Sequence, residues 1–246
     1  MISSYVETNL RLRYRRSFVG FLWTIIAPLL QYMIIAYVFK YASRITDHNY
    51  FAYFFTGAVV FNAFSVTLLR APNIMLANEM YIKKIYLPKS IYVLNTCLYE
   101  LTNFFFTGIT LFALGLLLGI ISPSAALLTV PLAIILLFIT LLGASAILAI
   151  GGVYFRDLSY IMPPIMQASF FLTPIIYRLE TFPEKIQKLI NFNPFYHIIE
   201  TIRIPITQGV LAPNEHYAVS FFTSLATIGV GYWMIKHFDN RIIFKL

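Results

Sequence analysis

Long apolar runs separated by short polar segments dominate this sequence. They predict helices at residues 19–39, 51–69, 91–121, 125–152, 160–177 and 218–235. A helix needs about 20 mostly apolar residues to cross a hydrocarbon core of about 30 Å, and each run is close to that length or longer. The pattern predicts an all-α polytopic membrane protein with six transmembrane helices. The connections are too short to hold a second core, so residues 1–246 are expected to form one domain.

The join between the fourth and fifth runs is a short charged elbow. An apolar stretch ends at Gly151-Gly152, Arg156 and Asp157 follow, and a second apolar stretch with three prolines begins. In lipid every backbone polar group needs an internal partner, so charges between two apolar runs favour a point where the chain emerges and turns back.

Residues 178–217 contain apolar pieces that are too short to cross a bilayer. Two helix starts stand out: the capping-box spacing from Thr181 to Glu184, and Asn193-Pro194, an N-cap residue followed by proline at the first helical position. They predict two short helices, which end near Asn191 and Ile204. Their apolar residues favour a re-entrant element in the outer leaflet. The alternative is an external loop folded back on the ends of the spans.

The N-terminal segment 5–18 is strongly basic. Its apolar and charged positions favour an amphipathic helix lying in the membrane interface. Alternatively, its arginines serve only to hold the N-terminus in the cytoplasm. The arginines concerned are Arg11, Arg13, Arg15 and Arg16.

Composition and charge support the membrane assignment. The chain is 59% hydrophobic and 11% charged, whereas about 25% of residues are charged in a typical soluble domain. The formal charge of +8 comes from residues that flank apolar runs instead of forming one basic face, so a nucleic-acid partner is not expected. With six spans, twelve of the 18 Lys and Arg residues fall on the side of both termini. The positive-inside rule therefore predicts cytoplasmic termini.

Motifs for enzyme chemistry are missing from the sequence. It contains no GxxxxGK[ST] motif, no nucleophile elbow and no useful carboxylate pair, so a P-loop or an intramembrane enzyme is not expected. We expect no metal and no cofactor in this chain, because its four histidines stand alone without metal-ligand spacing. They are His48, His197, His216 and His237.

A few side chains are candidates for a transport pathway or gate. Glu100 either sits at membrane depth, where an ionisable group marks a functional site, or lies near the cytoplasmic interface because the third span begins late. Aromatic side chains can stack on sugar rings, but they also serve as lipid contacts, interfacial belt or core. The aromatic candidates are Phe54, Phe61, Phe170, Tyr177, Phe195 and Tyr196.

Several motifs, in the right order over nearly the whole chain, resemble the membrane subunit of ABC-2 type exporters, specifically the polysaccharide branch. The family's entry into the first span resembles Arg13-Tyr14-Arg15-Arg16-Ser17, Leu22-Trp23 and Pro28-Leu29. Its first cytoplasmic loop resembles Ile82-Lys83-Lys84-Ile85-Tyr86-Leu87-Pro88. Its elbow, fifth span and outer element resemble Phe155-Arg156-Asp157-Leu158, Phe170-Phe171-Leu172-Thr173-Pro174-Ile175-Ile176-Tyr177 and Asn193-Pro194.

This resemblance implies a non-enzymatic half-transporter: a homodimer with two separate ATP-binding cassette subunits that bind ATP and Mg. A coupling helix at 74–86 would contact those subunits through Asn78, Glu79, Tyr81, Lys83 and Lys84. Arg156 and Asp157 would make a second contact; the alternative for them is a helix cap with a topology charge.

The resemblance also implies a cargo. The expected cargo is an undecaprenyl-linked polysaccharide, foremost O-antigen, exported from the cytoplasm across the bacterial inner membrane. Alternatives are teichoic acid, capsule, a lipid or a drug carried by an ABC-2 exporter, or an ATP-independent scramblase or membrane scaffold.

Overall fold

The computed structural model describes residues 23–42, 49–84, 87–117, 119, 121, 123–242 and 245. Within these ranges all regular elements are helices, so the predicted all-α class is confirmed. The predicted interfacial helix at 5–18, with its four arginines, lies outside the described residues.

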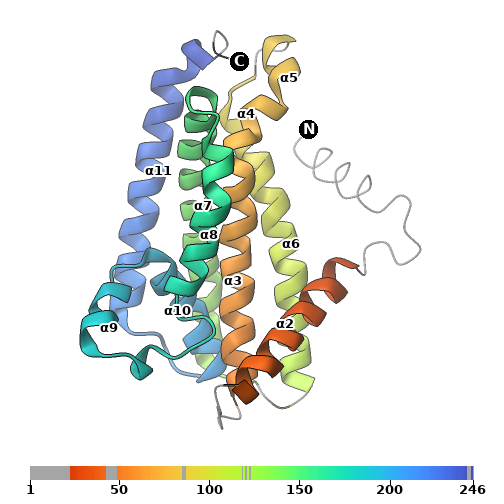
Figure 1. The fold of residues 1–246 in the computed structure, drawn as a ribbon, viewed down its shortest axis with the longest axis vertical. Coiled ribbons are helices and arrows are strands. Elements are labelled where there is room, and N and C mark those ends of the chain that lie inside the picture. The colour runs from red at the N-terminus through yellow and green to blue at the C-terminus, as the bar shows by residue number, and fades with distance from the viewer. Residues whose placement is uncertain are drawn as a thin grey trace.

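Six long helices form an elongated bundle (Figure 1). They are α2 (Trp23–Ala42), α3 (Tyr50–Arg70), α6 (Ser90–Leu117), α7 (Val130–Tyr154), α8 (Leu158–Leu172) and α11 (Asn214–Ile242). The short elements are η2 (Ala71–Asn73), α4 (Ile74–Ala77), α5 (Glu79–Lys84), η3 (Ala125–Thr129), η4 (Leu179–Thr181), α9 (Glu184–Ile190) and α10 (Pro194–Thr207).

Four helical stretches of the described chain are long and apolar enough to cross a membrane. They are Tyr50–Lys84, Ser90–Leu117, Ala125–Tyr154 and Asn214–Asp239. The apolar stretches in the predicted first and fifth spans are shorter, at Leu29–Phe39 and Leu158–Leu172. The chain is therefore a multi-pass membrane protein, and the count of six spans stays a prediction.

The predicted fifth span, 160–177, is wrong in its last five residues. Helix α8 ends at Leu172, and Thr173 is extended (φ −104°, ψ 134°). Thr173 precedes Pro174, and the proline ring disfavours helical geometry in the residue before it. The chain then bends, with Ile175 and Ile176 buried in the core. Other boundaries also shift: α6 ends at Leu117, four residues short of the predicted end, α7 follows a 3₁₀ turn, and α11 ends at Ile242, seven residues past the predicted end.

The two short helices between α8 and α11 are present, but only one of the two predicted helix starts is right. Asn193 caps α10 as predicted, since its side-chain oxygen accepts a hydrogen bond from the backbone N–H of Phe195 at 3.0 Å. The capping box is wrong. Thr181 belongs to η4, and the N-cap position of α9 is taken by Pro183 without a side-chain hydrogen bond.

Helices α7 and α11 pack closely because small residues face each other. A Cβ atom added at Gly143 would overlap the backbone of Thr227 and Ile228. Nearby, the hydroxyls of Thr140 and Ser224 are hydrogen-bonded at 2.9 Å. Small residues and interhelical hydroxyl bonds are the usual means of helix association in lipid, where burial of apolar surface gives little driving force.

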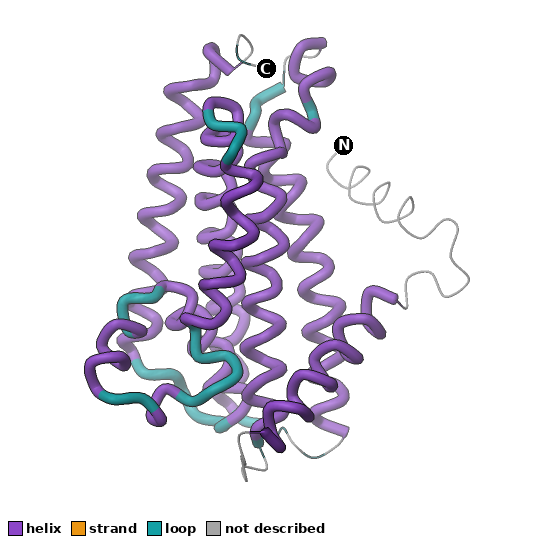
Figure 2. The backbone as a smooth tube through the Cα atoms, in the orientation of Figure 1, coloured by secondary structure: helices purple, strands orange, loops and turns teal. Residues whose placement is uncertain are grey.

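Short helices and connections gather at the two ends of the bundle, as Figures 1 and 2 show. At one end, which we call the elbow end, lie α4, α5, the α7–α8 connection and the last turns of α11. There Lys89, which is buried, pairs with Asp239 at 2.8 Å and joins α6 to α11. At the other end, the α10 end, the Tyr50 hydroxyl donates a hydrogen bond to the carbonyl of Ile176 at 2.9 Å.

Candidate functional site: exposed elbow end, buried ion pair and polar pocket

The predicted coupling helix is two short helices fixed to the bundle on one side. Ile74 and Met75 of α4 and Ile82 of α5 are buried in a cluster that includes Ile150 and Val153 of α7. The preceding 3₁₀ turn is held equally tightly, since a Cβ atom at Gly152 would overlap the backbone of Pro72. A displacement of α4 would therefore be transmitted directly to α7.

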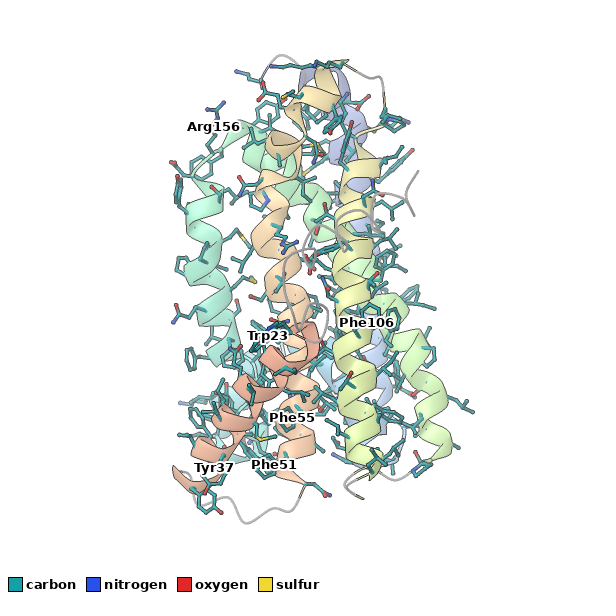
Figure 3. The ribbon with its side chains drawn as sticks, turned by 90° about the vertical axis from the view of Figure 1, so that its right-hand side faces the viewer. Trp23, Tyr37, Phe51, Phe55, Phe106 and Arg156 are labelled. Carbon is teal, nitrogen blue, oxygen red and sulfur yellow. The ribbon has the colours of Figure 1, made fainter. Side chains whose placement is uncertain are left out.

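The opposite side of this element is open. We call the exposed side chains of α5 and the α7–α8 connection the coupling surface: Met80, Tyr81, Lys83, Lys84, Phe155, Arg156 and Asp157. Met80 and Tyr81 are 69% and 61% exposed, and Arg156 projects away from the bundle in Figure 3. An exposed patch that combines a Met, aromatic rings and positive charges is typical of a protein-binding surface.

Two of the predicted coupling residues are used within the element itself. The Asn78 side chain donates a hydrogen bond to the carbonyl of Ile74 at 2.7 Å and so closes the end of α4. Glu79 pairs with Lys83 one turn later at 2.5 Å. The structure thus brings the predicted coupling residues to one end of the molecule and leaves the side chains of Tyr81, Lys83, Lys84, Arg156 and Asp157 exposed.

A buried ion pair at the α10 end was missed from the sequence. Arg203 of α10 is 1% exposed, and its guanidinium donates a hydrogen bond to the Glu200 carboxylate at 2.5 Å. The guanidinium also stacks on the Tyr53 ring of α3, 3.9 Å from its centroid. It fits there because Gly57, one turn along α3, has no side chain in its way. The sequence count of basic residues places Arg203 among the six on the side opposite the termini and does not reveal its pairing; the i, i+3 spacing from Glu200 in an apolar helix was the available signal.

This pair fixes α10 to the first turns of α3. The Tyr53 hydroxyl lies 3.1 Å and 3.0 Å from the carbonyls of Pro174 and Tyr177, in the bent segment after α8. The Tyr53 ring therefore links α3, α10 and the end of α8.

The carboxyl group of the pair is also perturbed. Burial raises the pKa of Glu200, and the adjacent Arg203 opposes that shift.

The histidines do not all stand alone, so that expectation is wrong for two of them. Nδ1 of His197 in α10 lies 3.0 Å from Nδ1 of His216 in α11, and Nε2 of His197 lies 2.7 Å from the carbonyl of Asn191. Their separation in sequence hid the contact. No cluster of three or more His, Cys, Asp or Glu residues suited to a metal ion occurs among the residues that the structure describes.

The candidate pathway aromatics lie mainly inside the subunit. Phe54 is fully buried and Phe61 is 4% exposed, both in the core of the bundle. Phe61 packs edge-to-face on Phe170 and Phe195, with ring centroids 5.3 Å and 6.0 Å apart. In this conformation these rings join α3, α8 and α10, and their role in a pathway stays a prediction.

Glu100 is enclosed by protein. It is 5% exposed, pairs with Arg70 at 2.5 Å and accepts a hydrogen bond from Asn103 at 3.2 Å. It lines a pocket of about 200 Å³ between α2, α3 and α6. Ten residues separate it from the start of α6, or about 15 Å along the helix axis.

Comparisons with known proteins agree with this architecture. The family model described as ABC-2 type transporter matches residues 2–206. The chain is 28% identical to an O-antigen export system permease protein, RfbA, of Klebsiella pneumoniae over 91% of this chain and 86% of that protein. It is 25% identical to the RfbA permease of Myxococcus xanthus (86% and 85% covered), and 21% identical to the polysialic acid transport protein KpsM of Escherichia coli (91% and 87% covered). Since the family model covers most of its length, the chain belongs to the ABC-2 type transporter family.

Proposed function

We propose that this chain is the permease subunit of an ATP-driven exporter of lipid-linked polysaccharide, with O-antigen as the foremost cargo. The observation that carries the proposal is that relatives named for the export of O-antigen and of polysialic acid align over most of this chain and of their own length. Because the chain is similar to exporters of two different glycans, the comparisons support polysaccharide as the class of cargo more strongly than they support any one glycan.

The energy is proposed to come from a separate ATP-binding cassette subunit that docks on the coupling surface. Two features support this docking site: its exposed Met80, Tyr81 and basic residues, and the rigid attachment of α4 to α7. The last residues of α3 connect to this surface through η2, and its first turns hold Tyr53 and Gly57 against Arg203 of α10. A movement imposed at the elbow end would therefore reach the α10 end along α3 as a rigid body.

A second copy of the chain is proposed to cover one side of α8. Gln167, Pro163 and Pro164 are exposed there, near the middle of an apolar helix. An amide side chain and the backbone carbonyls freed by prolines are costly against hydrocarbon, so they are expected to face protein or a water-filled passage. A homodimer with α8 at its interface satisfies these groups and forms a passage between the copies.

The elbow end is proposed to be cytoplasmic, in the bacterial inner membrane. Basic residues support this orientation: among the described residues the elbow end carries Arg70, Lys83, Lys84, Lys89, Arg156, Lys236 and Arg241, whereas the α10 end carries Lys40, Arg178, Lys185, Lys188 and Arg203. Cassette subunits hold ATP in the cytoplasm, which requires the same orientation.

Charge reversal on the coupling surface tests this proposal. Lys84→Glu and Arg156→Glu are expected to abolish most polysaccharide export and to weaken co-purification of the cassette subunit, with unchanged amounts of permease in the membrane. Lys185→Glu is the matched control, since it reverses an exposed lysine on α9 at the opposite end. Normal export by both elbow-end variants would refute the assigned docking site.

Deletion of the gene separates the candidate cargoes. Cytoplasmic accumulation of an undecaprenyl-linked glycan is expected. Its absence, with accumulation of another amphiphile, would favour the lipid or drug exporters of the same family. Transport by the purified chain without a cassette subunit would instead support a scramblase.

A further inference from the structure

A polar pocket lies within the candidate membrane spans, on the side of the bundle formed by α2, α3 and α6. Its volume is about 200 Å³, and its polar lining comes from Gln31, Asn62, Arg70, Glu100, Asn103 and Thr107. Asn62 lies eight residues before the end of α3, so the pocket reaches about 12 Å from that end of the helix. Polar side chains at such depth are expensive in lipid and mark a functional site by default.

An apolar groove continues from this pocket toward the α10 end. Its volume is about 600 Å³, and Val59 and Phe104 line both cavities. The groove is bounded by apolar residues of α2, α3, α6, α7 and α10, and Figure 3 shows Phe51 and Phe55 of α3 beside α2 on this side of the molecule. Gly108 of α6 opens it further, because a Cβ atom there would have no heavy atom within 4 Å.

The accessible charge in the polar pocket is positive. Arg70 and Glu100 form an ion pair, but the arginine side chain is 47% exposed while the glutamate side chain is 5% exposed. Asn62 and Gln31 are also exposed and offer amide groups. A guanidinium with nearby amides suits a phosphate or phosphodiester with adjoining hydroxyl groups.

We infer that these two cavities form one binding site for a single-chain lipid phosphate, with the phosphate at Arg70 and Asn62 and the hydrocarbon chain in the groove along α6. The groove volume of about 600 Å³ lies within the range of about 300–1,000 Å³ of ligand pockets in proteins, so the groove has room for part of one lipid chain. The inference rests on the proposed function, because it assigns the lipid carrier of the exported glycan to a place outside the α8 interface. The glycan and its lipid would then be held by different parts of the subunit.

Binding of undecaprenyl phosphate to the purified full-length permease tests the site directly, by native mass spectrometry with phosphatidylglycerol as competitor. The test variant Gly108→Leu places a side chain in the groove at a position where the added Cβ atom has no heavy atom within 4 Å. Its matched control is Gly229→Leu on α11, where a Cβ atom also has no heavy atom within 4 Å. A second variant, Asn62→Leu, removes an amide from the polar pocket and leaves the Arg70–Glu100 pair intact.

Wild type and Gly229→Leu are expected to bind undecaprenyl phosphate in preference to phosphatidylglycerol. Gly108→Leu and Asn62→Leu are expected to bind it about tenfold more weakly, as for the loss of one or two favourable contacts. Equal binding by all four proteins, or equal displacement by phosphatidylglycerol, would overturn the inference. Export by the wild type with its cassette subunit is measured in a separate assay. A failed lipid-binding test together with normal export would overturn this inference and leave the proposed function standing.

Discussion

Removal of Arg203 is predicted to destabilise the protein more than removal of any exposed arginine. Its guanidinium is buried, bonded to Glu200 and stacked 3.9 Å from the centroid of the Tyr53 ring. Breaking a buried pair by removing one partner leaves the other charge without compensation and costs about 3–5 kcal/mol. Arg203→Met is therefore expected to lower the free energy of unfolding by this amount.

The same aromatic ring offers a matched control. Arg178 also lies over Tyr53, at 5.3 Å from its centroid, but its side chain is exposed. Interactions of exposed charges are worth about 0–1 kcal/mol, so Arg178→Met is expected to change stability by no more than that. Comparing Arg203→Met with Arg178→Met separates the effect of burying the charge on stability from the effect of its contact with the Tyr53 ring.

A double variant then tests the pairing itself. Glu200→Leu combined with Arg203→Met replaces both buried charges with apolar groups, and such replacements are often neutral or stabilising. The double variant is expected to be more stable than Arg203→Met alone. Unfolding in mixed micelles of increasing SDS content, followed by tryptophan fluorescence, measures all four proteins. Equal losses for Arg203→Met and Arg178→Met, or a double variant less stable than the single one, would refute the reasoning.

Three further predictions concern contacts that hold the helices together. Gly143→Leu is expected to separate α7 from α11 and to abolish folded protein in size-exclusion chromatography, because its side chain would overlap the α11 backbone; Gly229→Leu should elute normally. Asn193→Ala should cost about 1–2 kcal/mol in the same unfolding assay, since it removes the cap of α10 and a 2.9 Å bond to Thr173. Lys89→Met should leave Asp239 without the ion-pair partner that Lys89 provides, and so destabilise the elbow end. Trypsin should then cleave α11 after Lys236 faster than in the wild type, and an unchanged cleavage rate would contradict this role.

The sequence pattern predicted the helices but not the contacts between their ends. Apolar runs of spanning length and the Asn193-Pro194 start were sufficient because they act locally, through lipid thickness and backbone capping. The break after Leu172 was hidden by an apolar run that continues to Tyr177, although Pro174 signalled it.

Most of the site at the α10 end was beyond sequence reasoning. The contact of Arg203 with Tyr53 joins residues 150 positions apart, and only the fold reveals that Gly57 leaves room for it. The position of the proposed coupling residues at one end of the bundle was easier to predict, because charges at a turn between apolar helices indicate where the chain leaves the membrane. Their contact with a cassette subunit stays a prediction.

The central claim is that motion is imposed on this subunit from its elbow end by a separate ATPase. Reconstitution into liposomes, with its cassette subunit added or omitted, tests this most directly when translocation of a lipid-linked glycan is measured with and without ATP. We predict translocation only when the cassette subunit and ATP are both present, and its loss with Lys84→Glu. Translocation by the permease alone at the same rate would contradict the account.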